Sequence, residues 1–140
     1  MKKKLSENLT LFKTSLYPYK TRFNSNKKHE VTLGIGGNVG DVKRTFHKLF
    51  LCLLKDSRFD ILITSPLLLN PPFGFLNQND FLNGIIVLKT NLSINAFFKS
   101  MQRYENRFKR TRSFKDAPRT LDIDIIFFAN KKINTKQLTI

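Results

Sequence analysis

Residues 107–124 read Arg107-Phe-Lys-Arg-Thr-Arg-Ser-Phe-Lys-Asp-Ala-Pro-Arg-Thr-Leu-Asp-Ile-Asp124, and they run directly into the apolar residues Ile125-Ile-Phe-Phe128. The apolar run predicts a buried strand, and residues two apart on a strand point to the same face. Asp122 and Asp124 are therefore expected to present adjacent carboxylates at the edge of a hydrophobic sheet. Two carboxylates this close repel each other and are costly to bury unless positive charge lies nearby.

The residues around the two aspartates suggest where that positive charge comes from. Mg²⁺ prefers oxygen ligands such as carboxylates. Guanidinium groups bind phosphate oxygens in bidentate geometry. The basic residues that precede Asp122 are Arg107, Lys109, Arg110, Arg112, Lys115 and Arg119. The pattern indicates polyphosphate chemistry. Plainer interpretations stay open for both groups. The two aspartates could belong to a solvated strand end or form an ion pair with a nearby arginine. The basic residues could form a solvated face or bind nucleic-acid phosphates.

The composition favours one globular domain in a reducing compartment. The chain has 140 residues, 41% of them hydrophobic, and 14 are Phe, which suits a single domain with a substantial core. Cys52 is the only cysteine, so an internal disulfide framework is excluded and a buried, inert thiol is expected. Because no apolar run approaches the ~20 residues of a spanning helix, we expect no membrane partner and a cytoplasmic protein.

The net charge of +15 (25 basic minus 10 acidic residues) calls for an anionic partner. The basic residues fall in two blocks rather than along one helix face, without zinc-ligand spacing or a recognisable nucleic-acid motif. We therefore do not expect nucleic acid as a partner, although a basic nucleic-acid-binding domain remains the alternative function. Residues 1–28 are expected to be a basic extension outside the core, and residues 29–140 the main domain.

Hydrophobic periodicity predicts six main elements. Helices are expected at 42–55, with Asp41 as N-cap, and at 94–108, with Ser93 as N-cap. The strands are expected at 31–35, 59–69 with a break at Ser65-Pro66, 85–88 and 120–128, followed by a hairpin at 129–132 and a last segment at 133–140. The order strand-helix-strand-strand-helix-strand predicts an α+β fold, a ferredoxin-like βαββαβ sandwich with a mostly antiparallel sheet and helices on one face.

A second group of candidate residues precedes the strand at 85–88. Asn83 offers both a hydrogen-bond donor and an acceptor, and Phe81 offers a flat face; together they would bind a flat heterocycle with amide-like edges. A turn asparagine and a core phenylalanine are the alternative. The loop that begins Asn70-Pro-Pro-Phe is stiff and suited to shaping a pocket.

The chain resembles the 6-hydroxymethyl-7,8-dihydropterin pyrophosphokinase family of the folate pathway. The motifs that carry the resemblance run in family order and cover roughly residues 31–140. They are Gly34-Ile-Gly-Gly-Asn-Val-Gly-Asp41, Asn70-Pro-Pro-Phe-Gly74, Asn79-Asp-Phe-Leu-Asn83, Gln102-x-x-Glu105, Arg110-x-Arg112 and Ala117-Pro-Arg-Thr-Leu-Asp-Ile-Asp-Ile-Ile126.

The resemblance implies transfer of pyrophosphate from ATP to the pterin hydroxymethyl oxygen by a monomer. It implies that Asp122 and Asp124 bind two Mg²⁺ ions and that Arg110, Arg112 and Arg119 neutralise phosphate charge. The nucleotide side would be formed by Gln102, Glu105, Lys115, Ile125 and Thr139. The pterin side would be formed by Gly36, Gly37, Asn38, Asn70, Pro71, Pro72, Phe73, Phe81 and Asn83.

The sequence departs from the family's pattern after its last strand. There the family continues into a Pro-His segment, a further arginine and a second pterin-stacking phenylalanine, whereas this sequence stops at Leu138-Thr-Ile140. We therefore expect that the C-terminal end of the domain is missing, and an inactive truncated pyrophosphokinase is a further alternative.

Overall fold

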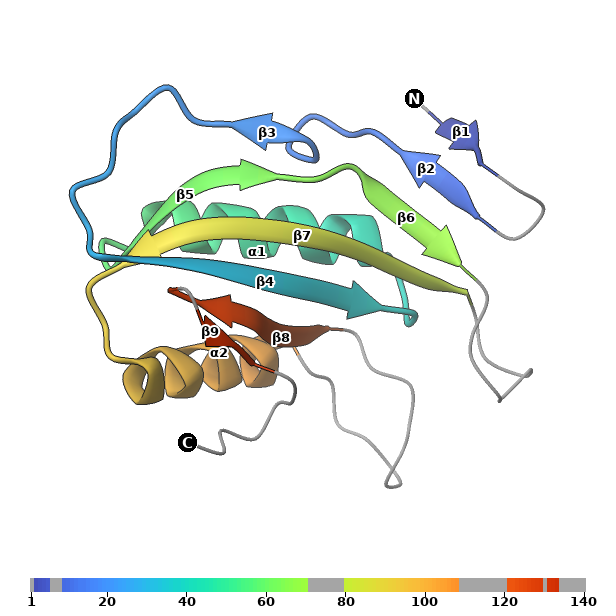
Figure 1. Cartoon of the computed structure of the whole chain (residues 1–140). Coiled ribbons are helices and arrows are strands. Elements are labelled where there is room, and N and C mark those ends of the chain that lie inside the picture. Colours follow the sequence, from blue (N-terminus) through green and yellow to red (C-terminus); the bar gives the residue numbers. More distant parts are fainter. Residues whose placement is uncertain (1, 6–8, 71–79, 109–120, 130, 134–140) are drawn as a thin grey trace.

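The computed structural model describes residues 2–5, 9–70, 80–108, 121–129 and 131–133. The strands are β1 (Lys2–Lys4), β2 (Thr10–Phe12), β3 (Tyr19–Lys20), β4 (His29–Gly37), β5 (Phe59–Thr64), β6 (Leu67–Asn70), β7 (Phe81–Thr90), β8 (Asp122–Phe128) and β9 (Lys131–Lys132), and the helices are α1 (Val42–Lys55) and α2 (Ile94–Phe108). The strands form one sheet in the order β1-β2-β6-β7-β4-β8-β9, with β5 on β7 and β3 on β5. Every pairing among the described strands is antiparallel (Figure 1).

The two helices cover one face of the sheet, and the other face is open. Burial alternates along the long central strands: Val31 and Leu33 of β4 and Ile86 and Leu88 of β7 are buried, and the residues between them are not. The buried residues join those of α1 and α2 in one core cluster. Figure 1 shows α1 behind the sheet, so the side of the sheet that faces the viewer is the open face. From β4 to β8 the order is the predicted one, and the predicted fold class is confirmed.

The predicted helix caps are confirmed. The Asp41 carboxylate accepts a hydrogen bond from the Arg44 N–H at 3.2 Å, and the Ser93 hydroxyl accepts one from the Ala96 N–H at 3.2 Å. Each satisfies a backbone donor that a helix start leaves without a partner. The first helix then ends at Lys55 and the second at Phe108, as the apolar spacing predicts.

Two central strands are longer than predicted. Strand β4 continues through Gly36 and Gly37, and β7 starts at Phe81, so Phe81 and Asn83 lie within a strand and not ahead of one. The cross-strand ladder explains the difference, because Gly36 pairs with Asn83 and continues the β4–β7 register. Glycine and asparagine have low strand propensity, which this tertiary pairing overrides.

The expectation that residues 1–28 lie outside the core was wrong for their central part. Tyr17 has 0% exposure, and its hydroxyl donates to the Phe46 carbonyl of α1 at 2.8 Å. Strands β2 and β3 of this segment extend the sheet. Basic residues dominate the composition here, but a few apolar side chains decide the packing because burying them removes apolar area from water.

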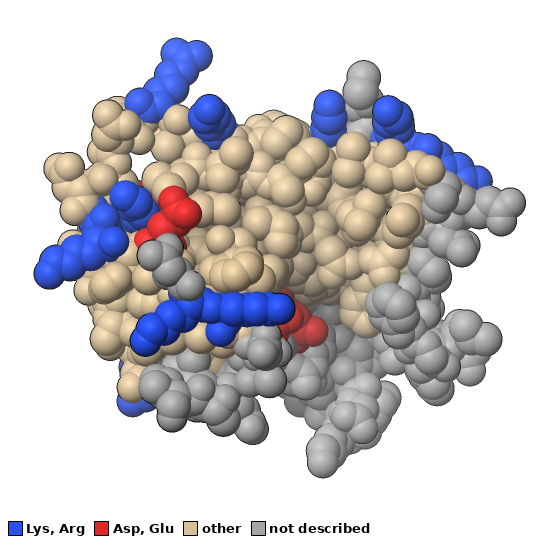
Figure 2. All heavy atoms as spheres, viewed as in Figure 1, with Lys and Arg blue, Asp and Glu red and all other residues tan. Residues whose placement is uncertain are grey.

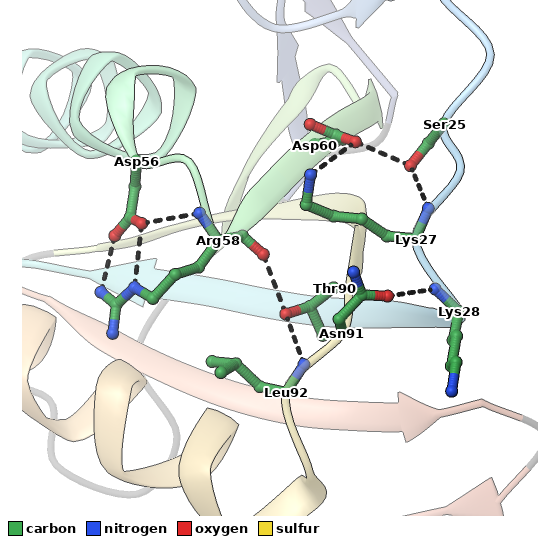
Figure 3. Close-up of polar contacts among 9 residues, drawn as sticks. All are labelled: Ser25, Lys27, Lys28, Asp56, Arg58, Asp60, Thr90, Asn91 and Leu92. Atoms are coloured by element: carbon green, nitrogen blue, oxygen red, sulfur yellow. Dashed lines mark hydrogen bonds and ion pairs between the residues drawn. The ribbon is translucent and has the colours of Figure 1, made fainter.

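A polar cluster joins the end of α1 to α2. The Arg58 guanidinium donates to both carboxylate oxygens of Asp56, at 2.9 and 2.6 Å (Figure 3). From α2, the Tyr104 hydroxyl donates to the same carboxylate at 2.7 Å. The Asp56 carboxylate is 13% exposed. The hydrogen bond from Arg58 holds the pKa of Asp56 well below its usual range.

We expect Asp56→Asn to lower the free energy of unfolding at pH 7 by about 1.5–3 kcal/mol, because hydrogen bonds to a charged group are lost. The folded-state pKa of Asp56 is lowered, so its contribution is present above the unfolded pKa of about 3.9 and is lost as pH falls below that value. Urea unfolding at pH 7 and pH 3 should therefore show the difference from wild type shrinking at pH 3.

Asp60→Asn is the matched control, because Asp60 is 42% exposed and pairs with Lys27 at 3.1 Å (Figure 3). An exposed pair of this kind contributes less than about 1 kcal/mol. Equal losses for the two variants, or an Asp56→Asn loss that is independent of pH, would contradict the prediction.

Candidate functional site

A cavity of about 350 Å³ lies on the open face of the sheet, over β4, β7 and β8. It brings together the two groups of candidate residues that are far apart in the sequence. The predicted residues that line it are Gly36, Asn70, Phe81, Asn83, Asp122 and Asp124. Gly34, Ile35, Gly84 and Ile85 line it as well. The sequence did not predict these four as site residues. The two-residue period of a strand could have indicated two of them, because Gly34 shares a face with Gly36 on β4, and Ile85 shares a face with Asn83 on β7.

The floor of this cavity is a row of residues paired across three strands. Gly36 of β4 lies opposite Asn83 of β7 on one side and opposite Asp122 of β8 on the other. A Cβ atom at Gly36 would lie 2.9 Å from the Asn83 Oδ1 atom. The absence of a side chain at Gly36 therefore leaves room between an amide and a carboxylate.

Two asparagines orient each other at one end of the cavity. The Asn83 side-chain amide donates from Nδ2 to the Asn70 Oδ1 atom at 2.6 Å. Asn70 is the last residue of β6 and lies opposite Phe81. Phe81 and Asn83 are two residues apart on β7, so both present their side chains to the open face. An aromatic ring beside an oriented amide suits a flat heterocycle that carries donors and acceptors on its edge.

Asp122 and Asp124 lie at the other end of the cavity. The predicted common face of Asp122 and Asp124 is confirmed, since buried Leu121, Ile123 and Ile125 alternate with them. Strand β9 pairs with β8 only at Phe127 and Phe128. In the described part of the chain, residues 122–124 thus have a single neighbouring strand, β4, as expected for a sheet edge.

Glu105 of α2 supports this edge. Its side chain is buried, and its Oε2 atom accepts a hydrogen bond from the Ile123 N–H at 2.6 Å. Ile123 lies between the two aspartates, so this bond fixes the backbone that carries them. The predicted contact of Glu105 with a nucleotide stays a prediction, as does that of Gln102, which is exposed on α2.

The acidic pair fits magnesium better than a metal held by protein ligands alone. Among the described residues no group of three His, Cys, Asp or Glu side chains is arranged to hold a metal ion. Mg²⁺ is commonly bound by one or two carboxylates, with water and substrate phosphates completing its coordination. Asp122 and Asp124 match that donor set.

The structure does not bring every predicted residue to the cavity. Gly37 is on the opposite face of β4, Asn38 is buried beside a second cavity of about 320 Å³, and the Ile125 side chain packs in the core. Other predicted residues lie outside the described part of the chain: Pro71, Pro72, Phe73, Arg110, Arg112, Lys115, Arg119 and Thr139. Neither described helix is long and apolar enough to cross a membrane.

The fold and the cavity define a ferredoxin-like α+β protein with an acidic pair and an aromatic–amide pair on the open face of its sheet. Residues 32–140 match the family described as 7,8-dihydro-6-hydroxymethylpterin-pyrophosphokinase. The chain belongs to this family, as the motifs predicted.

Curated relatives carry the corresponding name. A 2-amino-4-hydroxy-6-hydroxymethyldihydropteridine pyrophosphokinase of Campylobacter jejuni is 41% identical over 119 residues, which is 85% of this chain and 76% of the relative. The protein of that name from Helicobacter pylori is 44% identical over 102 residues, 71% of this chain and 63% of the relative. The chain thus spans between about three fifths and three quarters of the length of these two relatives.

Proposed function

We propose that this protein transfers pyrophosphate from ATP to the hydroxymethyl oxygen of 6-hydroxymethyl-7,8-dihydropterin, producing AMP and the pterin diphosphate for folate biosynthesis. Membership of the family and the names of its relatives support this function. The structural observation that carries it is the row Asn83–Gly36–Asp122, in which the Asn83 amide and the Asp122 carboxylate line one cavity.

The pterin side of the proposed site is formed by β6 and β7. Phe81 stacks on the pterin ring, and Asn83, held by Asn70, pairs with its amide-like edge. Gly36 provides the floor between the pterin and the phosphates. This arrangement would direct the hydroxymethyl oxygen towards Asp122 and Asp124, where the triphosphate of ATP would lie.

The phosphate side is formed by β8 and by the basic stretch ahead of it. We propose that Asp122 and Asp124 hold two Mg²⁺ ions, which when bound supply positive charge against the phosphates of ATP. Glu105 keeps the two carboxylates in place through Ile123. Arg110, Arg112 and Arg119 would neutralise phosphate charge as the pterin oxygen attacks the β-phosphorus and AMP leaves. Positioning and electrostatics account for most of the catalysis in such transfers.

The described residues of the open face give no support to the alternative function, binding of nucleic acid. In Figure 2, which shows the open face, the described Lys and Arg side chains form separate groups, mostly near the margins. A basic patch or stripe on one face is the electrostatic footprint of a nucleic-acid-binding protein, and the described side chains in this view do not form one. A monomeric state and a cytoplasmic location remain predictions.

The product of the reaction tests the proposal. The protein incubated with ATP, Mg²⁺ and the hydroxymethyl pterin is expected to release one AMP for each pterin diphosphate formed, as quantified by chromatography. Omitting the pterin or chelating Mg²⁺ with EDTA should abolish AMP release. Formation of ADP, or AMP release without the pterin, would contradict the proposal, and a complete lack of turnover would favour an inactive member of the family.

A further inference from the structure

The N-terminal strand β2 is the outer neighbour of the strand that ends at the cavity. In the β2–β6 register, Thr10 lies opposite Leu69 and Phe12 opposite Leu67, while the other side of β6 pairs with β7. Strand β6 has four residues, and its last residue is Asn70. Without β2, one row of backbone donors and acceptors of this short strand would face water, and such an edge frays easily.

Phe12 connects β2 to the start of α1. The Lys43 ammonium lies 3.7 Å from the centre of the Phe12 ring, a distance at which the cation is attracted to the ring face. The ring also packs against the core. With Lys43, Leu69 and Leu82 it lines the second cavity, of about 320 Å³. Phe12 therefore connects α1 to β6, the strand that carries Asn70.

Other contacts fix the N-terminal segment independently of Phe12. The Tyr17 hydroxyl donates to the Phe46 carbonyl at 2.8 Å, and the Thr64 hydroxyl donates to the Leu16 carbonyl at 2.6 Å. The Thr14 hydroxyl lies 2.9 Å from the His47 Nε2 atom. A change at Phe12 should thus loosen β2 and β6 while the rest of the segment stays bound.

We propose that β2, residues 10–12, is a positioning element for the pterin side of the site, acting through the β2–β6 pairing on Asn70 and thereby on the Asn83 amide. The choice of pterin as the affected substrate rests on the proposed function. The strand order β6-β7-β4-β8 separates β6 from the aspartates by two intervening strands. A loosened β6 therefore affects the pterin side and leaves the phosphate side intact.

Phe12→Ala tests the proposal, with Phe23→Ala as the matched control in the same segment, because the Phe23 side chain is 82% exposed. A small misplacement of binding groups reduces productive binding strongly, so we expect Phe12→Ala to raise the KM for pterin about tenfold. The KM for ATP and kcat should stay within about twofold of wild type. Phe12→Tyr, which keeps the ring face for Lys43, and Phe23→Ala should both behave as wild type. A rise of both KM values together, or no rise for pterin, would overturn the proposal.

Amide hydrogen exchange separates this proposal from the proposed function. In Phe12→Ala the β6 amides, Leu67–Asn70, should exchange about tenfold faster or more, and those of β8 should be unchanged. Unchanged β6 exchange, or equal acceleration in both strands, refutes the positioning role whether or not the protein turns over. If the unmodified protein makes no AMP while β6 alone responds to Phe12→Ala, the proposed function fails and the positioning of β6 by β2 stands.

Discussion

Replacing Asp124 with alanine is expected to lower the rate of AMP formation by a factor on the order of 10³ or more, because it removes one of the two carboxylates that we propose as Mg²⁺ ligands. The free energy of unfolding of the metal-free protein should change by less than about 1 kcal/mol, since removing one of two neighbouring like charges also removes their repulsion. Asp124 is exposed on the open face, so no core packing is lost. Initial rates at saturating ATP and pterin, and urea unfolding in EDTA, measure the two quantities.

Glu30→Ala is the matched control for this variant. Glu30 is an exposed carboxylate on β4, outside the cavity. AMP formation by Glu30→Ala should stay within about twofold of wild type, as for most surface changes away from a site. If Asp124→Ala kept most of its activity, or if the metal-free protein were strongly destabilised, the assignment of Asp124 to the metal would be wrong.

Asn83→Ala is the second change with a large expected effect. When a site recognises its substrate by hydrogen bonds, loss of one hydrogen-bonding partner weakens binding of the substrate by a large factor. We expect the KM for pterin to rise on the order of 10²-fold, with the KM for ATP within about threefold of wild type. Steady-state kinetics with each substrate varied at saturating levels of the other separates the two constants.

Asn70→Ala and Asn106→Ala are the two comparison variants for Asn83→Ala. Asn70→Ala removes the acceptor of the Asn83 amide but keeps Asn83 itself, so its effect on the KM for pterin should be smaller, about tenfold. Asn106 is exposed on α2 and away from the cavity, and its replacement should change neither constant. An Asn83→Ala protein with a normal KM for pterin would leave only a structural role for this residue.

Local sequence patterns predicted the regular elements well. Both helices follow from apolar residues at helical spacing and from a capping side chain, Asp41 or Ser93, at their starts. The common face of Asp122 and Asp124 follows from the two-residue period of a strand. These features depend on neighbours within a few positions, so the local sequence is sufficient to predict them.

The extent of the central strands was less predictable. The sequence predicts a start of β7 that is too late, because Asn83 and Gly84 suggest a turn. Pairing with β4 on one side and β6 on the other extends the strand to Phe81. Cross-strand hydrogen bonds join residues distant in sequence, and intrinsic propensities do not contain them.

The sequence by itself therefore determined the fold class, the family and the chemical types of the site residues, since each is carried by a local motif. The tertiary structure alone decided which of those residues meet. It put Gly36 between Asn83 and Asp122, turned Glu105 inward to the Ile123 N–H, and buried Tyr17 of a segment that its basic composition placed outside the core. The physical reason is that sheet register and apolar burial are set by contacts between distant segments, and these contacts form only when the whole sheet assembles.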